Sequence, residues 1–233
     1  MEYPPEKKKS EENLEVFNAL CALIPTYGDI NSLFFKTIIP NSYEKRKNKW
    51  YRKLADVVSE LQTKVDNLSE VIKEDQFTTL FIRASITAYK TEHVEKYEAL
   101  KNVLINSVIE LNVNEDMLIV FIDLVDRLTV SHLKILKFIN DNPDNIIKAT
   151  SYDSLFEAFT KYNQNRICER YEFNFLFKEL ERNGLIFISS DIKEFTGINE
   201  PILLASESEN TAFPNLKINE IGLSFLKFIN PQD

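Results

Sequence analysis

Hydrophobic residues recur at helical spacing along the first half of the chain and predict a body of antiparallel helices. In 54–67, apolar residues three and four positions apart form one face of a helix. The next stretch, 75–109, contains neither glycine nor proline, and it predicts one long helix or two helices that meet near Lys90. A third helix is expected over 115–126, and the short intervals between these stretches favour antiparallel neighbours.

A short break around residue 128 separates this helical body from the rest of the chain. Thr129 is a good N-cap for a new helix, and Pro143 ends that helix because proline cannot continue the hydrogen-bond ladder. We therefore expect a helical domain over 13–127 and a second domain over 128–233.

The second domain shows the order helix, helix, helix, strand, long polar segment, strand, helix, which is the order of a winged-helix module. The ranges expected for these helices and strands are 130–140, 151–162, 167–184, 185–189, 215–218 and 219–229. The apolar residues of the third helix that we expect to face the core are Tyr171, Phe175, Leu176 and Leu180. The predicted fold class is mainly α: an antiparallel helical body followed by a winged-helix-like α+β module.

The N-terminal part of the chain combines a charged beginning with a strongly apolar stretch. Residues 1–12 are rich in charge and proline, so we expect a disordered tail. Residues 14–40 are apolar, but Pro25 and Gly28 divide them into pieces shorter than the roughly 20 residues of a membrane span. Two interpretations stay open: a pair of short helices packed into the body, or a helical hairpin that docks on a membrane or a partner.

A basic and aromatic cluster follows at 44–53, where six cations stand against one carboxylate and Tyr51 lies among them. Such a cluster is typical of contact with phosphates of nucleic acid or of lipid head groups. The candidate contact residues are Lys45, Arg46, Lys49, Trp50, Arg52 and Lys53. On a helix these side chains point in several directions, so a solvated charged face is the alternative.

The third helix of the second domain carries the other candidate contact surface. In a winged-helix module this helix can enter the major groove of DNA. Its cations are Arg170, Lys178 and Arg182, and its carboxylates are Glu169, Glu172, Glu179 and Glu181. Because DNA binding requires that phosphates be neutralised, we favour protein contact over DNA contact for this surface.

Composition narrows the chemistry further. The 233 residues carry a net charge of −8, which argues against a nucleic-acid binder, and four glycines leave no glycine-rich phosphate loop. Cys21 and Cys168 have no CxxC neighbour, so we expect reduced thiols in a cytoplasmic protein. His93 and His132 are too few for a histidine-based metal site, and we expect His132 to pack half-buried at a helix start. No metal and no cofactor are predicted.

The chain resembles an uncharacterised family of bacterial proteins over about 15–230. The stretches that carry the resemblance are EKRKNKWYRKLADVVSELQTKV (44–65), TEHVEKYEALKNVLINS (91–107), DLVDRLTVSHLKILKFI (123–139) and KINEIGLSFLKFI (217–229). Val130 stands where the family often has proline after the capping threonine. The family has no established activity, and the resemblance implies a cytoplasmic bacterial protein that is accessory to phage defence or stress.

These patterns predict an intracellular bacterial protein that is a non-enzymatic protein-interaction or regulatory module, with a protein partner or a second copy of itself. The first alternative is a nucleic-acid-binding regulator that uses the winged helix or the basic cluster. The second is a peripheral membrane-associated protein that uses residues 14–53. An enzyme could use paired acids that are buried together, and Asp123 and Asp126 lie on one helix face at i, i+3, but we expect both to be solvated charges of that helix.

Overall fold

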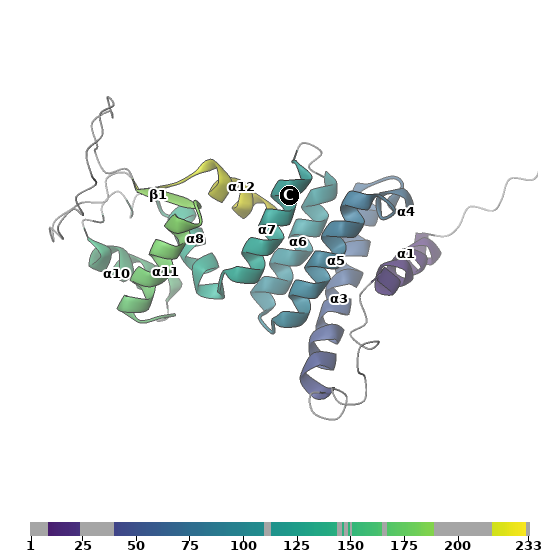
Figure 1. The fold of residues 1–233 in the computed structure, drawn as a ribbon, viewed down its shortest axis with the longest axis horizontal. Coiled ribbons are helices and arrows are strands. Elements are labelled where there is room, and N and C mark those ends of the chain that lie inside the picture. Colours follow the sequence, from purple (N-terminus) through teal and green to yellow (C-terminus); the bar gives the residue numbers. More distant parts are fainter. Residues whose placement is uncertain are drawn as a thin grey trace, which may run out of the picture. The chain divides into compact units, whose positions relative to one another are not determined.

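The computed structural model describes residues 9–23, 40–109, 113–143, 146, 149, 151–164, 167–188 and 216–231. Over these residues the protein is mainly α, with ten helices and one small two-stranded sheet (Figure 1). The described residues form two compact units. The first unit runs up to Arg127 and also contains the residues from Lys227 onward, and the second unit is Leu128–Leu226.

The first unit is a bundle of helices. Its helices are α1 (Lys9–Leu23), α3 (Pro40–Lys64), α4 (Leu68–Val71), α5 (Asp75–Lys90), α6 (Val94–Ile109) and α7 (Glu115–Arg127). Helices α3, α5, α6 and α7 pack side by side (Figure 1). Their apolar stripes meet in one core, which explains why the helical spacing of the sequence predicted a helical body.

The stretch 75–109 forms two helices, which confirms the second of the two predicted alternatives. The chain leaves helical geometry at Thr91, whose backbone is extended. The hydroxyl of Tyr97, a buried residue of α6, donates a hydrogen bond of 2.8 Å to the Thr91 carbonyl oxygen. This bond satisfies a backbone acceptor that the break would otherwise leave without a helical partner.

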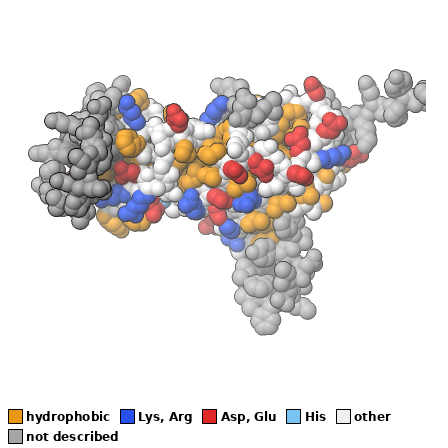
Figure 2. All heavy atoms as spheres, turned by 45° about the horizontal axis from the view of Figure 1, so that its top comes forward, with side chains coloured by type: hydrophobic (Ala, Val, Ile, Leu, Met, Phe, Trp, Pro, Cys, Tyr) orange, Lys and Arg blue, Asp and Glu red, His pale blue; other side chains and the backbone are white. Residues whose placement is uncertain are grey.

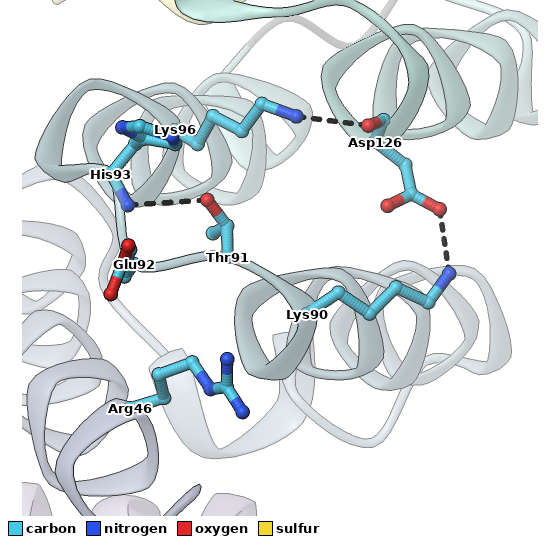
Figure 3. Close-up of a pocket in the computed structure, with 7 residues that line it drawn as sticks. All are labelled: Arg46, Lys90, Thr91, Glu92, His93, Lys96 and Asp126. Atoms are coloured by element: carbon cyan, nitrogen blue, oxygen red, sulfur yellow. Dashed lines mark hydrogen bonds and ion pairs between the residues drawn. The ribbon is translucent and has the colours of Figure 1, made fainter. Parts of the chain in front are cut away.

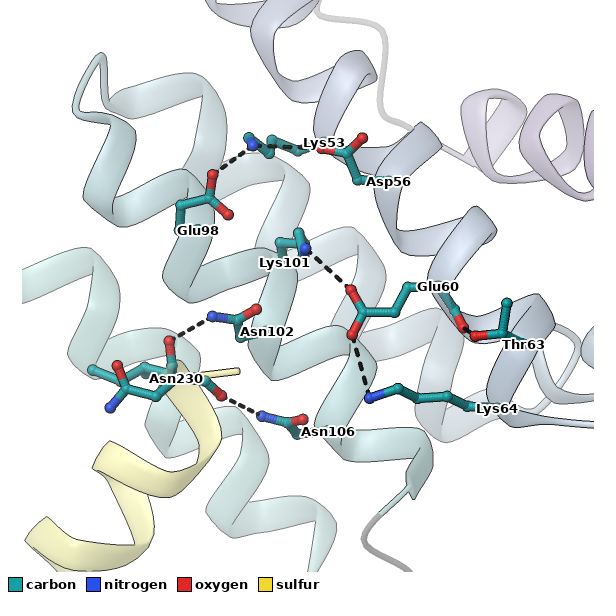
Figure 4. Close-up of polar contacts among 11 residues, drawn as sticks. Lys53, Asp56, Glu60, Thr63, Lys64, Glu98, Lys101, Asn102, Asn106 and Asn230 are labelled. Atoms are coloured by element: carbon teal, nitrogen blue, oxygen red, sulfur yellow. Dashed lines mark hydrogen bonds and ion pairs between the residues drawn. The ribbon is translucent and has the colours of Figure 1, made fainter. Parts of the chain in front are cut away.

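The end of α12 (Glu220–Ile229) is held in the first unit by two buried asparagines of α6. Asn102 donates 2.9 Å to the carbonyl oxygen of Ile229, and Asn106 donates 3.0 Å to that of Asn230 (Figure 4). Asn106 also donates 2.9 Å to the carbonyl oxygen of Phe228. The last carbonyls of a helix have no partner within the helix. The two amides therefore satisfy the C-terminal end of α12 inside the core.

Helix α1 begins inside the range that was predicted to be a disordered tail. It starts at Lys9, so the prediction of disorder is wrong for 9–12, and residues 1–8 lie outside the described residues. Lysine and glutamate, which are frequent there, are good helix formers. Val16 and Leu20 of α1 are buried at 2% and 1% exposure, and the helix packs against α3. Apolar burial thus extends helical structure into this charged segment.

Among the described residues, the second unit holds three complete helices, the small sheet and the first part of α12. Its complete elements are α8 (Val130–Asp141), α10 (Tyr152–Asn163), α11 (Arg170–Arg182), β1 (Ile186–Ile188) and β2 (Leu216–Ile218). The strands pair antiparallel with Ile186 opposite Ile218, which confirms the predicted strand pair. The segment between the strands lies outside the described residues, and the winged-helix assignment stays a prediction. The predicted second domain ran to residue 233, whereas the chain from Lys227 onward belongs to the first unit.

Aromatic side chains fill the core of the second unit. Phe173 of α11 lies 5.5 Å from Phe156 and 5.1 Å from Phe159 of α10, measured between ring centroids. Phe138 of α8 meets Phe159 edge-on at 5.5 Å. Such contacts add to the burial of apolar area, so α8, α10 and α11 are tied together through their rings.

Candidate functional site

Trp50, predicted as a surface contact, is a core residue. Its side chain is 0% exposed, and its indole N–H donates 2.9 Å to the hydroxyl of Ser85, which is also 0% exposed. The ring stacks on Tyr97 at 6.4 Å between centroids. A buried tryptophan with a satisfied N–H has no free face for a ligand. The prediction that Trp50 is a surface contact residue is therefore corrected.

The cations around Trp50 do not converge on one surface. Lys53 bridges to Glu98 at 2.5 Å, and the hydrogen bond to this carboxylate raises the pKa of the Lys53 ammonium (Figure 4). Lys49 donates 3.5 Å to a backbone carbonyl oxygen. Lys45 and Arg52 are exposed. The remaining member of the predicted set, Arg46, points into a hollow of the first unit, described next.

This hollow lies where the α5–α6 junction meets α3 and the end of α7 (Figure 3). Its volume is about 330 Å³. The lining is polar, and the residues that form it are Arg46, Lys90, Thr91, Glu92, His93, Lys96 and Asp126. We call this site the polar hollow.

Asp126 organises the cations on one wall of the polar hollow. Its carboxylate lies 2.6 Å from the Lys90 ammonium, and its backbone carbonyl accepts a hydrogen bond of 2.9 Å from Lys96 (Figure 3). Burial lowers the pKa of Lys96, the nearby Asp126 charge opposes this, and Lys90 adds to it. Two lysines are thereby held close together on this wall.

The exposed face of α11 carries an unexpected pair of aromatic rings. Tyr171 is 72% exposed and Phe175 is 56% exposed, whereas Phe173, Phe177 and Leu180 are buried. The prediction that Tyr171 and Phe175 face the core is therefore wrong. Apolar residues occur on two sides of α11, and the buried set fits the spacing i, i+4, i+7. The exposed pair Tyr171 and Phe175 also keeps helical spacing, so the spacing alone did not identify the buried face.

Two of the predicted contact residues lie on that same exposed face. Lys178 and Arg182 follow Phe175 at three and seven positions, which places all of them along one side of the helix. Both cations are exposed, and neither makes an ion pair with another described residue. We call Tyr171, Phe175, Lys178 and Arg182 the α11 stripe.

Arg170, the third predicted residue of this surface, has a different environment. Its guanidinium lies 2.8 Å from the carboxylate of Asp153 and 5.9 Å from the ring centroid of Phe156. The side chain thus joins α11 to α10 through an ion pair and a cation–π contact. The structure therefore places Lys178 and Arg182 on one face of α11, whereas Arg170 contacts α10.

His132 is buried at 2% exposure, deeper than the predicted half-buried position. Its Nδ1 accepts a hydrogen bond of 3.0 Å from the backbone N–H of Thr129, and the Thr129 hydroxyl accepts from the backbone of His132 in return. Its Nε2 lies 3.2 Å from the Glu179 carboxylate. These contacts form a capping box and link α8 to α11, so the histidine is a structural residue.

The described residues contain no group of three histidine, cysteine, aspartate or glutamate side chains that could hold a metal ion. The acids Asp123 and Asp126 are not buried together, because Asp123 is 54% exposed beside Arg83 while Asp126 faces the polar hollow. None of the described helices combines the length and the apolar character needed to span a bilayer. Of the predicted docking segment 14–40, residues 24–39 lie outside the described residues.

Comparisons of the chain with protein-family models, with curated proteins and with solved structures find no match. The resemblance to a bacterial family therefore stays a prediction.

Proposed function

We propose that this protein is a non-enzymatic interaction module that recognises a protein partner through the α11 stripe, on a second unit that acts as a winged helix. The observation that carries the proposal is the exposure of Tyr171 and Phe175 beside Lys178 and Arg182, two cations that form no ion pair with another described residue. Tyrosine, phenylalanine and arginine are enriched in protein interfaces, and such residues often supply most of the binding energy.

The stripe sets the chemistry of the partner. Its aromatic half, at the start of α11, fits apolar pockets, and its cationic half, at the end, fits carboxylates. From Tyr171 to Arg182 the stripe extends for about 17 Å along the helix axis, at about 1.5 Å per residue. We infer a partner with an apolar groove that ends in an acidic patch, because both halves must be covered at once. A second copy of this chain would qualify if it presented such a surface.

A nucleic acid is a weaker fit to the same face. The stripe offers two cations, and Glu172, Glu179 and Glu181 lie on its flanks. Figure 2 shows acidic and basic side chains interspersed over the described residues of one face, so that face offers no patch of one sign to a phosphate backbone. We keep nucleic-acid binding as an outcome of the test. The resemblance to bacterial proteins supports the proposal that the module works in the cytoplasm.

The test is a pull-down of tagged protein from its native lysate after nuclease treatment. The double variant Lys178→Glu with Arg182→Glu reverses the charge of the stripe, and Lys137→Glu, an exposed lysine of α8, is the matched control. We expect one set of proteins to be retained by the wild type and by the control and to be lost from the double variant. Circular dichroism checks that all three proteins are equally folded.

Two results would count against the proposal. Retention of the same proteins by the double variant would show that the stripe is not the contact surface. Recovery of nucleic acid in place of protein, with a steep fall in affinity as salt rises, would favour the nucleic-acid alternative.

A further inference from the structure

An arginine that pairs with no other described residue lies in the polar hollow of the first unit. Arg46 extends from α3 into the hollow, and its guanidinium makes no hydrogen bond or ion pair with any other described residue (Figure 3). Its Nε–H is shielded from solvent and finds no acceptor in the part of the chain that the structure describes. Buried donors almost always have a partner, and an exception calls for an explanation such as a bound ion.

The charges around Arg46 are unbalanced. The hollow is lined by three cations, Arg46, Lys90 and Lys96, and by two carboxylates, Glu92 and Asp126. The Asp126 carboxylate is engaged by Lys90 at 2.6 Å, so it does not neutralise Arg46. The lining thus carries three positive charges against two negative ones, and no described carboxylate forms an ion pair with Arg46.

The start of α6 adds to this excess. The helix begins at Val94, directly after the lining residues Glu92 and His93, and Lys96 lies in its first turn. The N-terminal end of a helix is electropositive, and a lysine there is unfavourable unless an anion is near. Burial is a separate cause that disfavours this charge and lowers the pKa of Lys96, with Asp126 opposing the shift and Lys90 adding to it. A bound anion would stabilise the Lys96 ammonium in this position.

We propose that the polar hollow is a binding site for a small anion that bears a phosphate group. The guanidinium of Arg46 would hold two phosphate oxygens with its planar fork, and Lys96 would face the phosphate from the opposite wall. The volume of about 330 Å³ admits a phosphate with a small substituent. This site lies in the first unit and is independent of the protein partner proposed for the α11 stripe.

Isothermal titration calorimetry with inorganic phosphate, at constant ionic strength, tests this proposal. The variant Arg46→Gln removes the fork, Arg46→Lys keeps the charge without it, and Arg52→Gln, an exposed arginine on another face of α3, is the matched control. We expect saturable binding of one phosphate, weakened about tenfold or more in Arg46→Gln, because charge-assisted bonds are the strong ones. Arg46→Lys should fall between, and Arg52→Gln should equal the wild type.

A second arm separates a free phosphate compound from a lipid head group. Vesicles with phosphatidylglycerol are sedimented with the protein, with and without inorganic phosphate. We expect inorganic phosphate to bind without vesicles. The absence of saturable phosphate heat, equal weakening in Arg46→Gln and Arg52→Gln, or binding to vesicles alone would each overturn the proposal.

Discussion

The buried pair of Trp50 and Ser85 gives the sharpest test of the first unit. The change Ser85→Ala removes the acceptor of the indole N–H and adds no bulk. Both side chains are 0% exposed, so water cannot replace the lost oxygen without a rearrangement of the core. A buried donor left without a partner costs about 1–3 kcal/mol of the free energy of unfolding. This is a large part of the roughly 5–15 kcal/mol that typically stabilises a domain.

The assay is urea unfolding followed by tryptophan fluorescence. The chain has one tryptophan, so its fluorescence reports on the first unit. With a urea dependence of about 1–3 kcal/mol per molar, Ser85→Ala should lower the midpoint by about 1 M. Ser59→Ala, an exposed serine on α3, is the control and should stay within about 0.5 kcal/mol of the wild type. An unchanged midpoint for Ser85→Ala would refute the buried hydrogen bond between Trp50 and Ser85. It would favour the prediction that Trp50 belongs to the basic and aromatic surface cluster.

Three further predictions concern other contacts. Asn106→Ala should cost about 1–3 kcal/mol and speed hydrogen exchange in the last turn of α12, because its amide donates to that turn; unchanged exchange would contradict this. Burial raises the pKa of Tyr97 to about 12 from about 10 in the unfolded chain, so stability should fall as pH rises between these values, by about 2–3 kcal/mol in total. In urea titrations at alkaline pH, Tyr97→Phe should not show this loss of stability. An equal loss of stability in the wild type and in Tyr97→Phe as pH rises would count against this prediction. Gly222→Ala should destabilise the second unit by about 1–3 kcal/mol in thermal melts followed by circular dichroism, because its Cβ would meet the Leu185 carbonyl oxygen; a wild-type melt would disprove the close approach.

The helices of the first unit could be predicted because their apolar stripes are regular, but the environment of Trp50 could not be predicted from its neighbours. Six cations surround it in sequence and suggested a surface cluster. The structure places it on the same stripe as Leu54 and Val57, at i, i+4 and i+7, all at 0% exposure. The stripe extends one turn further back than the charges suggested, and helical spacing outweighs local composition here.

The face of α11 shows a different limit of sequence reasoning. Apolar residues occur on two sides of this helix, so two stripes satisfy the helical spacing. Which stripe is buried depends on the rings of α10, which contact Phe173. Packing between distant segments made that choice, and it left Tyr171 and Phe175 exposed.

The polar hollow could not be found from sequence for a related reason. Its lining comes from α3, from the α5–α6 junction and from Asp126 near the end of α7, and these segments share no motif. The sequence identified Arg46 as a candidate but grouped it with its neighbours on α3. Only the packing of three helices brings it to Lys90 and Lys96.

Photo-crosslinking in cells tests the central claim, that the α11 stripe is a protein-recognition surface, most directly. A photoreactive phenylalanine analogue replaces Phe175 in one variant and Ile86, which is 37% exposed on α5, in the control. The account predicts light-dependent adducts with a polypeptide at position 175, none at position 86, and loss of the adducts when Lys178 and Arg182 are changed to glutamate. Absence of adducts at position 175, or the same adducts at both positions, would contradict it.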